Sequence, residues 1–269
     1  MGVNFFTGRA AFTQFILGTI PLAVGSGFFV RWGETPVFVT ARHNLTGRHW
    51  LTDDTLREDG RTPDRISINV PIVEDTPSGA RFGFQEVIVE LEQDYKPIWK
   101  ELLHRQGPCD FAAIPFYGTW EPAFIERWKA RHSIDGSFKI ACMNDGDDWF
   151  DSVQRQLKVS AQAFVLGFPF GIAAGAPNRP IWRGGNVATE PAGDFDGWPI
   201  FLVDASGRKG MSGAPVVVRD DSGLLRFSGI YSGRIRKEED NSELGYVWKA
   251  PKILELLSKA YGVQKPPNN

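Results

Sequence analysis

Three short patterns in the 269-residue sequence contain residues suited to acyl transfer through a serine. Ser212 lies in the glycine-rich segment GMSGAP, His43 follows an apolar run, and Asp110 begins another apolar run. A glycine turn can expose a serine hydroxyl, and the N–H groups of Gly210 and Ser212 can form an oxyanion hole worth about 3 kcal/mol per donor. A histidine accepts and returns a proton near neutral pH, and a buried carboxylate can orient it.

Each pattern alone also has a plain structural interpretation. The glycine turn can be a surface loop, His43 an exposed loop residue, and Asp110 the start of a strand. Together they have the chain order His, Asp, Ser, which is the order of the chymotrypsin arrangement, whereas subtilisin-like enzymes and α/β-hydrolases use other orders. The other three histidines follow no comparable strand, so His43 is the candidate general base.

Short β-branched and aromatic runs, separated by glycine and proline, must position these residues. This pattern is typical of an all-β barrel or sandwich. A first set of runs lies between Phe15 and Phe116, and a second set between Phe138 and Lys249. From Pro251 onward, apolar residues at the spacing of one helical face predict a C-terminal helix that packs on the strands.

Four blocks of the sequence resemble trypsin-like serine peptidases of the chymotrypsin fold, in particular bacterial Deg-type members: GSGFFV, TARH, DFAAI and GMSGAP. FVLGFPF at 164–170 and GIYS at 229–232 are also similar to that family. The resemblance implies that Ser212 attacks the scissile carbonyl, His43 transfers the proton and Asp110 stabilises the imidazolium. It also implies that Gly210 and Ser212 hold the oxyanion.

The implied fold is two six-stranded antiparallel β-barrels with a C-terminal helix. Residues 1–117 are expected to form the first barrel with His43 and Asp110, and residues 118–155 the connection, with a short helix around Ala123 to Arg131. Residues 156–269 are expected to form the second barrel with Ser212 and the C-terminal helix.

The same resemblance implies a set of substrate-binding residues: Ser206, Tyr231, Ser232, Gly233 and Arg234. Ser206 would form the base of the primary specificity pocket. Because its side chain is uncharged, we do not expect the pocket to require Lys or Arg in the substrate. Ser232 corresponds to the serine that usually bonds the triad aspartate.

Two features depart from the digestive members of that family. Met211 stands where they have an aspartate that pairs with a newly cleaved N-terminus, so no such zymogen switch is expected. Arg208 and Lys209 would favour acidic substrates if they faced the cleft, the alternative being a solvated turn. We also expect no appended PDZ domain.

The composition argues against some classes of binding partner and of cofactor. Thirty basic and 32 acidic residues give a net charge of -2, so there is no broad positive field for nucleic acid or an anionic membrane. Cys109 and Cys142 are the only cysteines and are expected to be reduced thiols. The N-terminus lacks a basic region and has interrupted apolar runs, which predicts neither a signal peptide nor a membrane span, and favours a cytoplasmic location. No metal-ligand spacing occurs, so no metal or cofactor is expected.

These features predict a serine endopeptidase that hydrolyses protein or peptide substrates through an acyl-enzyme, under the control of a regulatory protein partner or of the substrate. Two alternatives remain open. One is a catalytically inactive trypsin-like binding or scaffold module, and the other is an esterase that uses the same triad.

Overall fold

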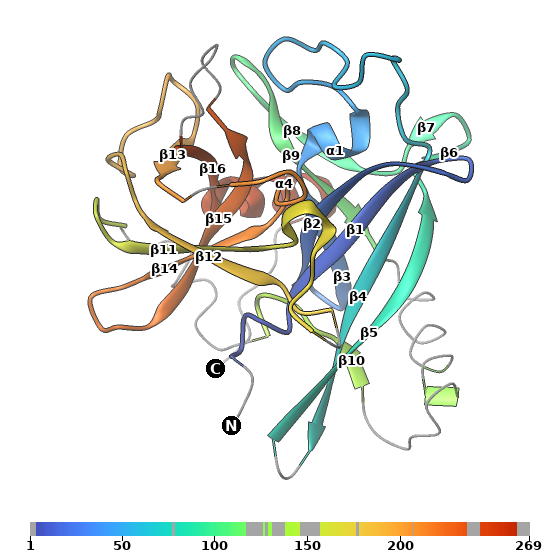
Figure 1. Ribbon diagram of the computed structural model, residues 1–269, viewed down its shortest axis with the longest axis horizontal. Helices are drawn as coiled ribbons and strands as arrows, with labels where there is room; N and C mark the ends of the chain where they lie inside the picture. The colour runs from blue at the N-terminus through green and yellow to red at the C-terminus, as the bar shows by residue number, and fades with distance from the viewer. Residues whose placement is uncertain are drawn as a thin grey trace.

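Two curled antiparallel sheets, with a helix packed against them, make up the architecture (Figure 1). The computed structural model of the protein describes residues 4–76, 79–116, 126, 129–130, 138–145, 157–175, 178–205, 207–235 and 243–262. Strands predominate among these residues, as the short apolar runs of the sequence predict. The all-β class is therefore confirmed.

The first sheet has eight strands among the described residues, in the order β10-β4-β1-β2-β3-β9-β8, with β5 paired to β4. Six were expected. Buried and half-buried side chains alternate along β1, which is the pattern of a strand with one face toward a core. The strands of the first sheet are β1 (Ala10–Leu17), β2 (Ile20–Trp32), β3 (Thr35–Thr40), β4 (Arg65–Thr76), β5 (Gly79–Glu90), β8 (Lys100–His104), β9 (Gly107–Pro115) and β10 (Phe138–Ile140). A separate ribbon pairs β6 (Glu92–Gln93) with β7 (Lys96–Pro97).

Strand β10 corrects one sequence-based assignment. Residues 138–142 were expected to belong to the second set of strands, but β10 pairs with β4 of the first sheet. Ile140 lies opposite Ile72, and both side chains are buried in the core of the first sheet. A run of three residues has too little pattern to specify which sheet it joins, so the apolar contact with β4 decides.

The second sheet has six described strands, in the order β12-β11-β14-β15-β16-β13. Every neighbouring pair is antiparallel. A register shift between Tyr231 and Gly233 bends the end of β15. The strands are β11 (Gln162–Gly167), β12 (Ile181–Asn186), β13 (Ile200–Val203), β14 (Pro215–Arg219), β15 (Leu225–Arg234) and β16 (Gly245–Lys249).

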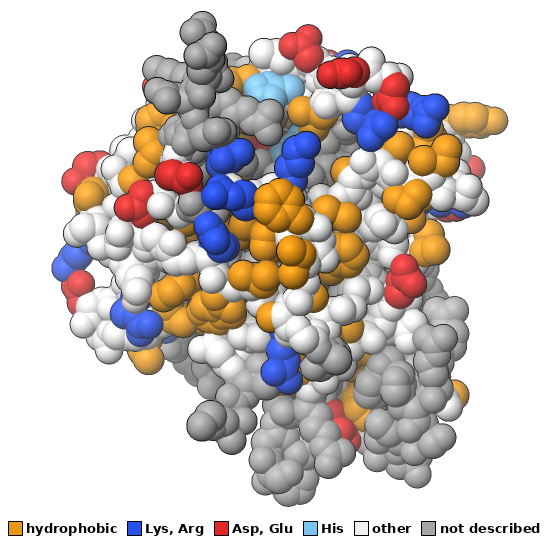
Figure 2. All heavy atoms as spheres, in the orientation of Figure 1, with side chains coloured by type: hydrophobic (Ala, Val, Ile, Leu, Met, Phe, Trp, Pro, Cys, Tyr) orange, Lys and Arg blue, Asp and Glu red, His pale blue; other side chains and the backbone are white. Residues whose placement is uncertain are grey.

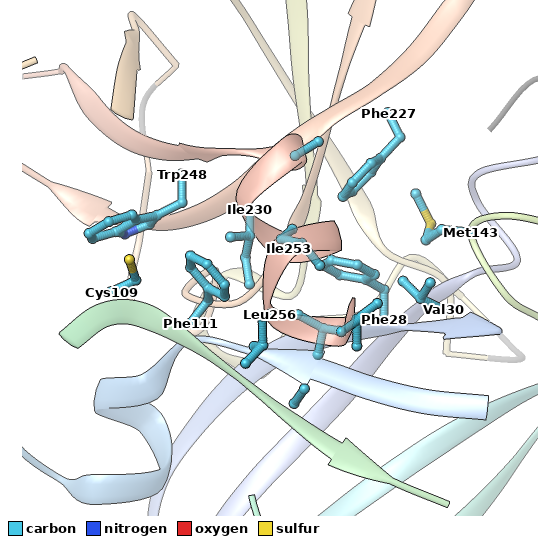
Figure 3. Packing of buried hydrophobic residues seen from close by; sticks show 14 of the residues in the cluster. Phe28, Val30, Cys109, Phe111, Met143, Phe227, Ile230, Trp248, Ile253 and Leu256 are labelled. Atoms are coloured by element: carbon cyan, nitrogen blue, oxygen red, sulfur yellow. The ribbon is translucent and has the colours of Figure 1, made fainter. Parts of the chain in front are cut away.

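A shared apolar core joins the two sheets and the helix α4 (Ala250–Tyr261). Figure 3 shows side chains of α4 meeting Phe28 of β2, Phe111 of β9 and Ile230 of β15. The helix buries Ile253, Leu256 and Leu257, whereas Leu254 and Tyr261 are only half-buried. Burial of these side chains removes apolar surface from water and holds both sheets together. The predicted docking of a C-terminal helix is confirmed.

Several expectations concern residues that lie outside the described part of the chain. The predicted boundaries at 117/118 and 155/156 fall there, as does most of the helix expected around Ala123 to Arg131. Within the described residues, no helix is long and apolar enough to cross a membrane.

Candidate active site

His43 and Asp110 are held together by the junction of β3, the short helix α1 (Arg42–Thr46) and β9. Asp110 is completely buried, and its carboxylate accepts two hydrogen bonds from His43. The backbone N–H donates to Oδ1 at 2.8 Å, and Nδ1 lies 2.6 Å from Oδ2. A carboxylate only accepts, so this contact assigns the proton to Nδ1 and leaves Nε2 of a neutral ring as an acceptor. The imidazole is 14% exposed and can therefore meet a substrate.

The turn before Ser212 leaves two backbone donors without acceptors. The N–H of Met211 donates to the carbonyl of Arg208 at 3.1 Å, which closes the turn around Gly210. Among the described residues, neither the N–H of Gly210 nor the N–H of Ser212 has a hydrogen-bond acceptor. A buried or half-buried N–H without an acceptor is costly unless a ligand supplies one. These two groups are the donors expected for an oxyanion hole.

Glycine is required on both sides of the serine. Gly210 has φ +92° and Gly213 has φ +89°, a conformation that disfavours residues with a Cβ atom. A Cβ at Gly210 would overlap the carbonyl oxygen of Phe168, and one at Gly213 would overlap the carbonyl oxygen of Ser26. The loop therefore packs backbone against backbone, on one side with the second sheet and on the other with β2.

Ser26 of β2 and Asn44 of α1 fix the carbonyl groups of this loop. The Ser26 hydroxyl donates to the Gly210 carbonyl at 2.7 Å. The carbonyl of Ser212 accepts from the N–H of Ser26 at 2.9 Å and from Asn44 Nδ2 at 3.0 Å. Because Asn44 directly follows His43 in α1, these bonds hold the backbone of Ser212 beside the helix that carries the histidine. Sequence reasoning missed Ser26 and Asn44, although Ser26 lies inside the GSGFFV motif and Asn44 directly follows TARH.

The Ser212 hydroxyl does not reach His43 in this structure. It donates to the carbonyl of Ser232 at 3.2 Å, and no hydrogen bond between Ser212 and His43 occurs within the described chain. The Ser232 hydroxyl, which was expected to bond Asp110, instead accepts a hydrogen bond from Trp248 Nε1 at 3.3 Å. Within the described residues Asp110 accepts from His43 alone, and no hydrogen bond joins it to Ser232.

The remaining predicted substrate-binding residues differ in how accessible they are to a substrate. Ser206 lies outside the described residues. Gly233 and Arg234 are half-buried at the end of β15, and Arg234 forms no ion pair with the described side chains. Tyr231 is 1% exposed, so a substrate cannot reach its side chain from the surface. Burial raises the pKa of the Tyr231 phenol well above its usual range.

The loop also adjoins an apolar surface formed around η1 (Pro169–Gly171). The N–H of Phe170 donates to the carbonyl of Lys209 at 2.6 Å, while its side chain is 61% exposed. Figure 2 shows hydrophobic side chains gathered over η1 and the neighbouring strands, with Lys and Arg side chains beside them. Ile172, at 54% exposure, belongs to the same surface.

Met211, in the same loop, is fully buried among apolar residues of the second sheet. Cys109 and Cys142 are buried and form no disulfide among the described residues, and burial raises the pKa of the Cys109 thiol to about 12. Among the described residues, no group of three or more His, Cys, Asp and Glu side chains is arranged to hold a metal ion.

The chain is similar in structure to a serine endoprotease from Yersinia pestis, with a TM-score of 0.51 and 12% sequence identity over 96% of this chain and 67% of that one. It is also similar to Rv3671c from M. tuberculosis H37Rv, solved as a serine-to-alanine mutant in an inactive form, with a TM-score of 0.45 and 13% identity over 97% of this chain and 90% of that one. No protein-family model and no curated protein matches the sequence. The first likeness and the two curled sheets show the trypsin-like serine protease fold, as predicted.

Proposed function

We propose that this chain is a serine endopeptidase in which Ser212 is the nucleophile, His43 the general base and Asp110 the residue that orients the base. The observation that carries the proposal is the double contact between His43 and a completely buried Asp110. It assigns the ring proton to Nδ1, the tautomer in which Nε2 can accept a proton from a serine. Asn44, next to His43, bonds the backbone of Ser212.

The reaction begins when the Ser212 side chain turns from the Ser232 carbonyl toward His43 Nε2. As the oxygen attacks the scissile carbonyl carbon, its proton moves to Nε2, and the Asp110 carboxylate stabilises the imidazolium. The negative charge that develops on the carbonyl oxygen is bound by the N–H groups of Gly210 and Ser212. His43 then protonates the leaving amine. In the second half of the reaction His43 takes a proton from water, whose oxygen attacks the acyl carbon, and returns that proton to the Ser212 oxygen as the ester bond breaks and the acid leaves.

A peptide substrate would lie along the end of β15. The Ser232 carbonyl, which accepts from the Ser212 hydroxyl at 3.2 Å, is also available to a substrate backbone N–H. A substrate that takes this carbonyl releases the serine hydroxyl toward His43. Substrate binding would thus assemble the nucleophile, which supports control by the substrate or by a partner that orders the same strand.

The bond between Ser212 and Ser232 also favours a second candidate, a binding or scaffold module without catalysis. In such a module the hydroxyl would remain on the Ser232 carbonyl, and the fold alone would serve the function. This candidate and the peptidase differ in one property, the nucleophilicity of Ser212.

Labelling with a fluorophosphonate probe measures that property directly. We expect the folded protein to be labelled at Ser212, as mapped by mass spectrometry, and the label to be lost in Ser212→Ala and His43→Ala. Ser222→Ala, which alters an exposed turn serine, is the matched control and should label normally. Hydrolysis of an unfolded protein substrate, sensitive to the same two substitutions, would then distinguish a peptidase from an esterase. A folded sample that is not labelled, alone or with substrate peptide present, would contradict catalysis.

A further inference from the structure

Tyr231 is attached directly to the loop that carries Ser212. Its N–H donates to the carbonyl of Ala214 at 2.9 Å, and its carbonyl accepts from the N–H of Gly213 at 2.8 Å. The next residue, Ser232, accepts the bond from the Ser212 hydroxyl. The position of Tyr231 relative to the nucleophile is therefore fixed by three hydrogen bonds.

Two glycines make room for the Tyr231 ring. A Cβ at Gly207, in the loop before Ser212, would overlap the phenol Oη. A Cβ at Gly245, the first residue of β16, would overlap the ring carbon Cε2. The ring thus extends from the loop to β16, in a space that exists because both positions lack a side chain.

This space is the one that a substrate side chain would enter. The scissile carbonyl oxygen must lie at the N–H groups of Gly210 and Ser212, and the chain before it must pass the carbonyl of Ser232. The residue that contributes the carbonyl, here called P1, then lies between the segment 207–212 and the end of β15. A side chain directed between these two walls would meet the space that the Tyr231 ring occupies.

We infer that Tyr231 fills the P1 pocket from within, so that the protein cleaves after residues with small side chains: glycine, alanine or serine. The inference rests on the proposed peptidase function and names its substrate class. It also revises the role expected for Tyr231, whose buried ring occupies the space into which a larger substrate side chain would extend.

The aromatic ring of Tyr231, and not its hydroxyl group, sets the preference for small side chains. Among the described residues the Oη of Tyr231 has no hydrogen-bond partner, so it holds no neighbour in place. Tyr231→Phe keeps the ring and should retain the same order of preference. Tyr231→Ala and Tyr231→Val remove it and should open a pocket for leucine or phenylalanine, since a site of fixed shape discriminates by the volume it can accept.

The test compares peptidyl phosphonate esters that differ only at P1, with alanine, valine or phenylalanine, by their rates of Ser212 modification. We expect the unmodified protein and Tyr231→Phe to react with the alanine compound about 100-fold faster than with the phenylalanine compound. Tyr231→Ala should reduce this ratio at least tenfold or reverse it. Near-ultraviolet circular dichroism verifies the fold, and Tyr231→Val replaces Tyr231→Ala if the latter does not fold.

Equal rates for alanine and phenylalanine in the unmodified protein would overturn the inference, as would an unchanged ratio in a folded Tyr231→Ala or Tyr231→Val. Binding of peptides that end in alanine or phenylalanine, measured by calorimetry, examines the pocket without any chemistry. If Ser212 does not react but the alanine peptide binds more tightly and Tyr231→Ala removes this difference, the catalytic proposal fails and the pocket assignment stands. If neither Ser212 reactivity nor binding depends on P1 size, the pocket assignment is wrong.

Discussion

Replacing Asp110 by asparagine tests the central contact of the site with almost no change in volume. The carboxylate accepts the backbone N–H of His43 at 2.8 Å and Nδ1 at 2.6 Å. An amide has one acceptor oxygen. If that oxygen keeps the backbone N–H, the NH2 group faces Nδ1 and pairs with it only when Nδ1 is unprotonated. The ring proton then moves to Nε2, which can no longer accept the proton of Ser212.

The magnitude follows from this exchange of tautomers. The wrong tautomer lowers turnover about 10⁴-fold in triad enzymes, equivalent to about 5 kcal/mol of transition-state stabilisation. The folded state loses less, because the geometry is retained and only a hydrogen bond to a charged group, worth about 1.5–3 kcal/mol, is weakened. Asp110→Asn should therefore remain folded while Ser212 becomes almost unreactive.

The assay is the second-order rate of fluorophosphonate labelling, measured together with unfolding in guanidinium chloride. Asp145→Asn is the matched control, because the Asp145 carboxylate is also buried but accepts the N–H of Cys142 at 2.8 Å and lies 3.8 Å from Arg9 Nη2. It should lower the free energy of unfolding without changing the labelling rate of the folded protein. A labelling rate for Asp110→Asn within tenfold of the original protein would refute the assignment of Asp110 as the orienting residue.

Three further changes probe the loop and the buried thiol. Gly213→Ala should lower the free energy of unfolding by about 3 kcal/mol or more, because the added methyl group would overlap the Ser26 carbonyl. The control Gly223→Ala, at φ +82° with nothing within 4 Å of the added Cβ, should lower it by only about 1–2 kcal/mol. Equal losses in denaturant unfolding would contradict the steric explanation. Ser26→Ala removes the donor to the Gly210 carbonyl, and it should lower the free energy of unfolding by about 1–3 kcal/mol and slow the labelling of Ser212. An unchanged labelling rate would mean that Ser26 does not support the turn that forms the oxyanion hole. Because burial raises the pKa of Cys109 to about 12, this thiol should resist a thiol reagent at about pH 9 until the chain is unfolded, and rapid modification of the native thiol would disprove its burial. The ordinary pKa of a cysteine is about 8.5, so the unfolded state loses the proton first and the free energy of unfolding should fall as the pH rises above that value.

Much of the candidate site was predictable because its signals are local. Residues that need unusual backbone conformations reveal themselves by type, and the glycines at 210 and 213 have the positive φ angles that a tight turn requires. A buried aspartate at the head of an apolar run needs a partner, and the structure supplies His43. The C-terminal helix was predictable because its apolar spacing matches one helical face.

The chain by itself determined the all-β class, the positions of the glycine turn and the order of histidine, aspartate and serine, since each depends on residue type or short-range spacing. The tertiary structure alone decided that Ser26 bonds Gly210, 184 residues away, that β10 joins the first sheet, and that the Ser212 hydroxyl rests on the Ser232 carbonyl. It also decided that the ring of Tyr231 lies between Gly207 and Gly245. Contacts between distant segments leave no periodic pattern along the chain, because they are selected by the shape of the packed sheets and by which polar groups remain unpaired once the sheets have closed.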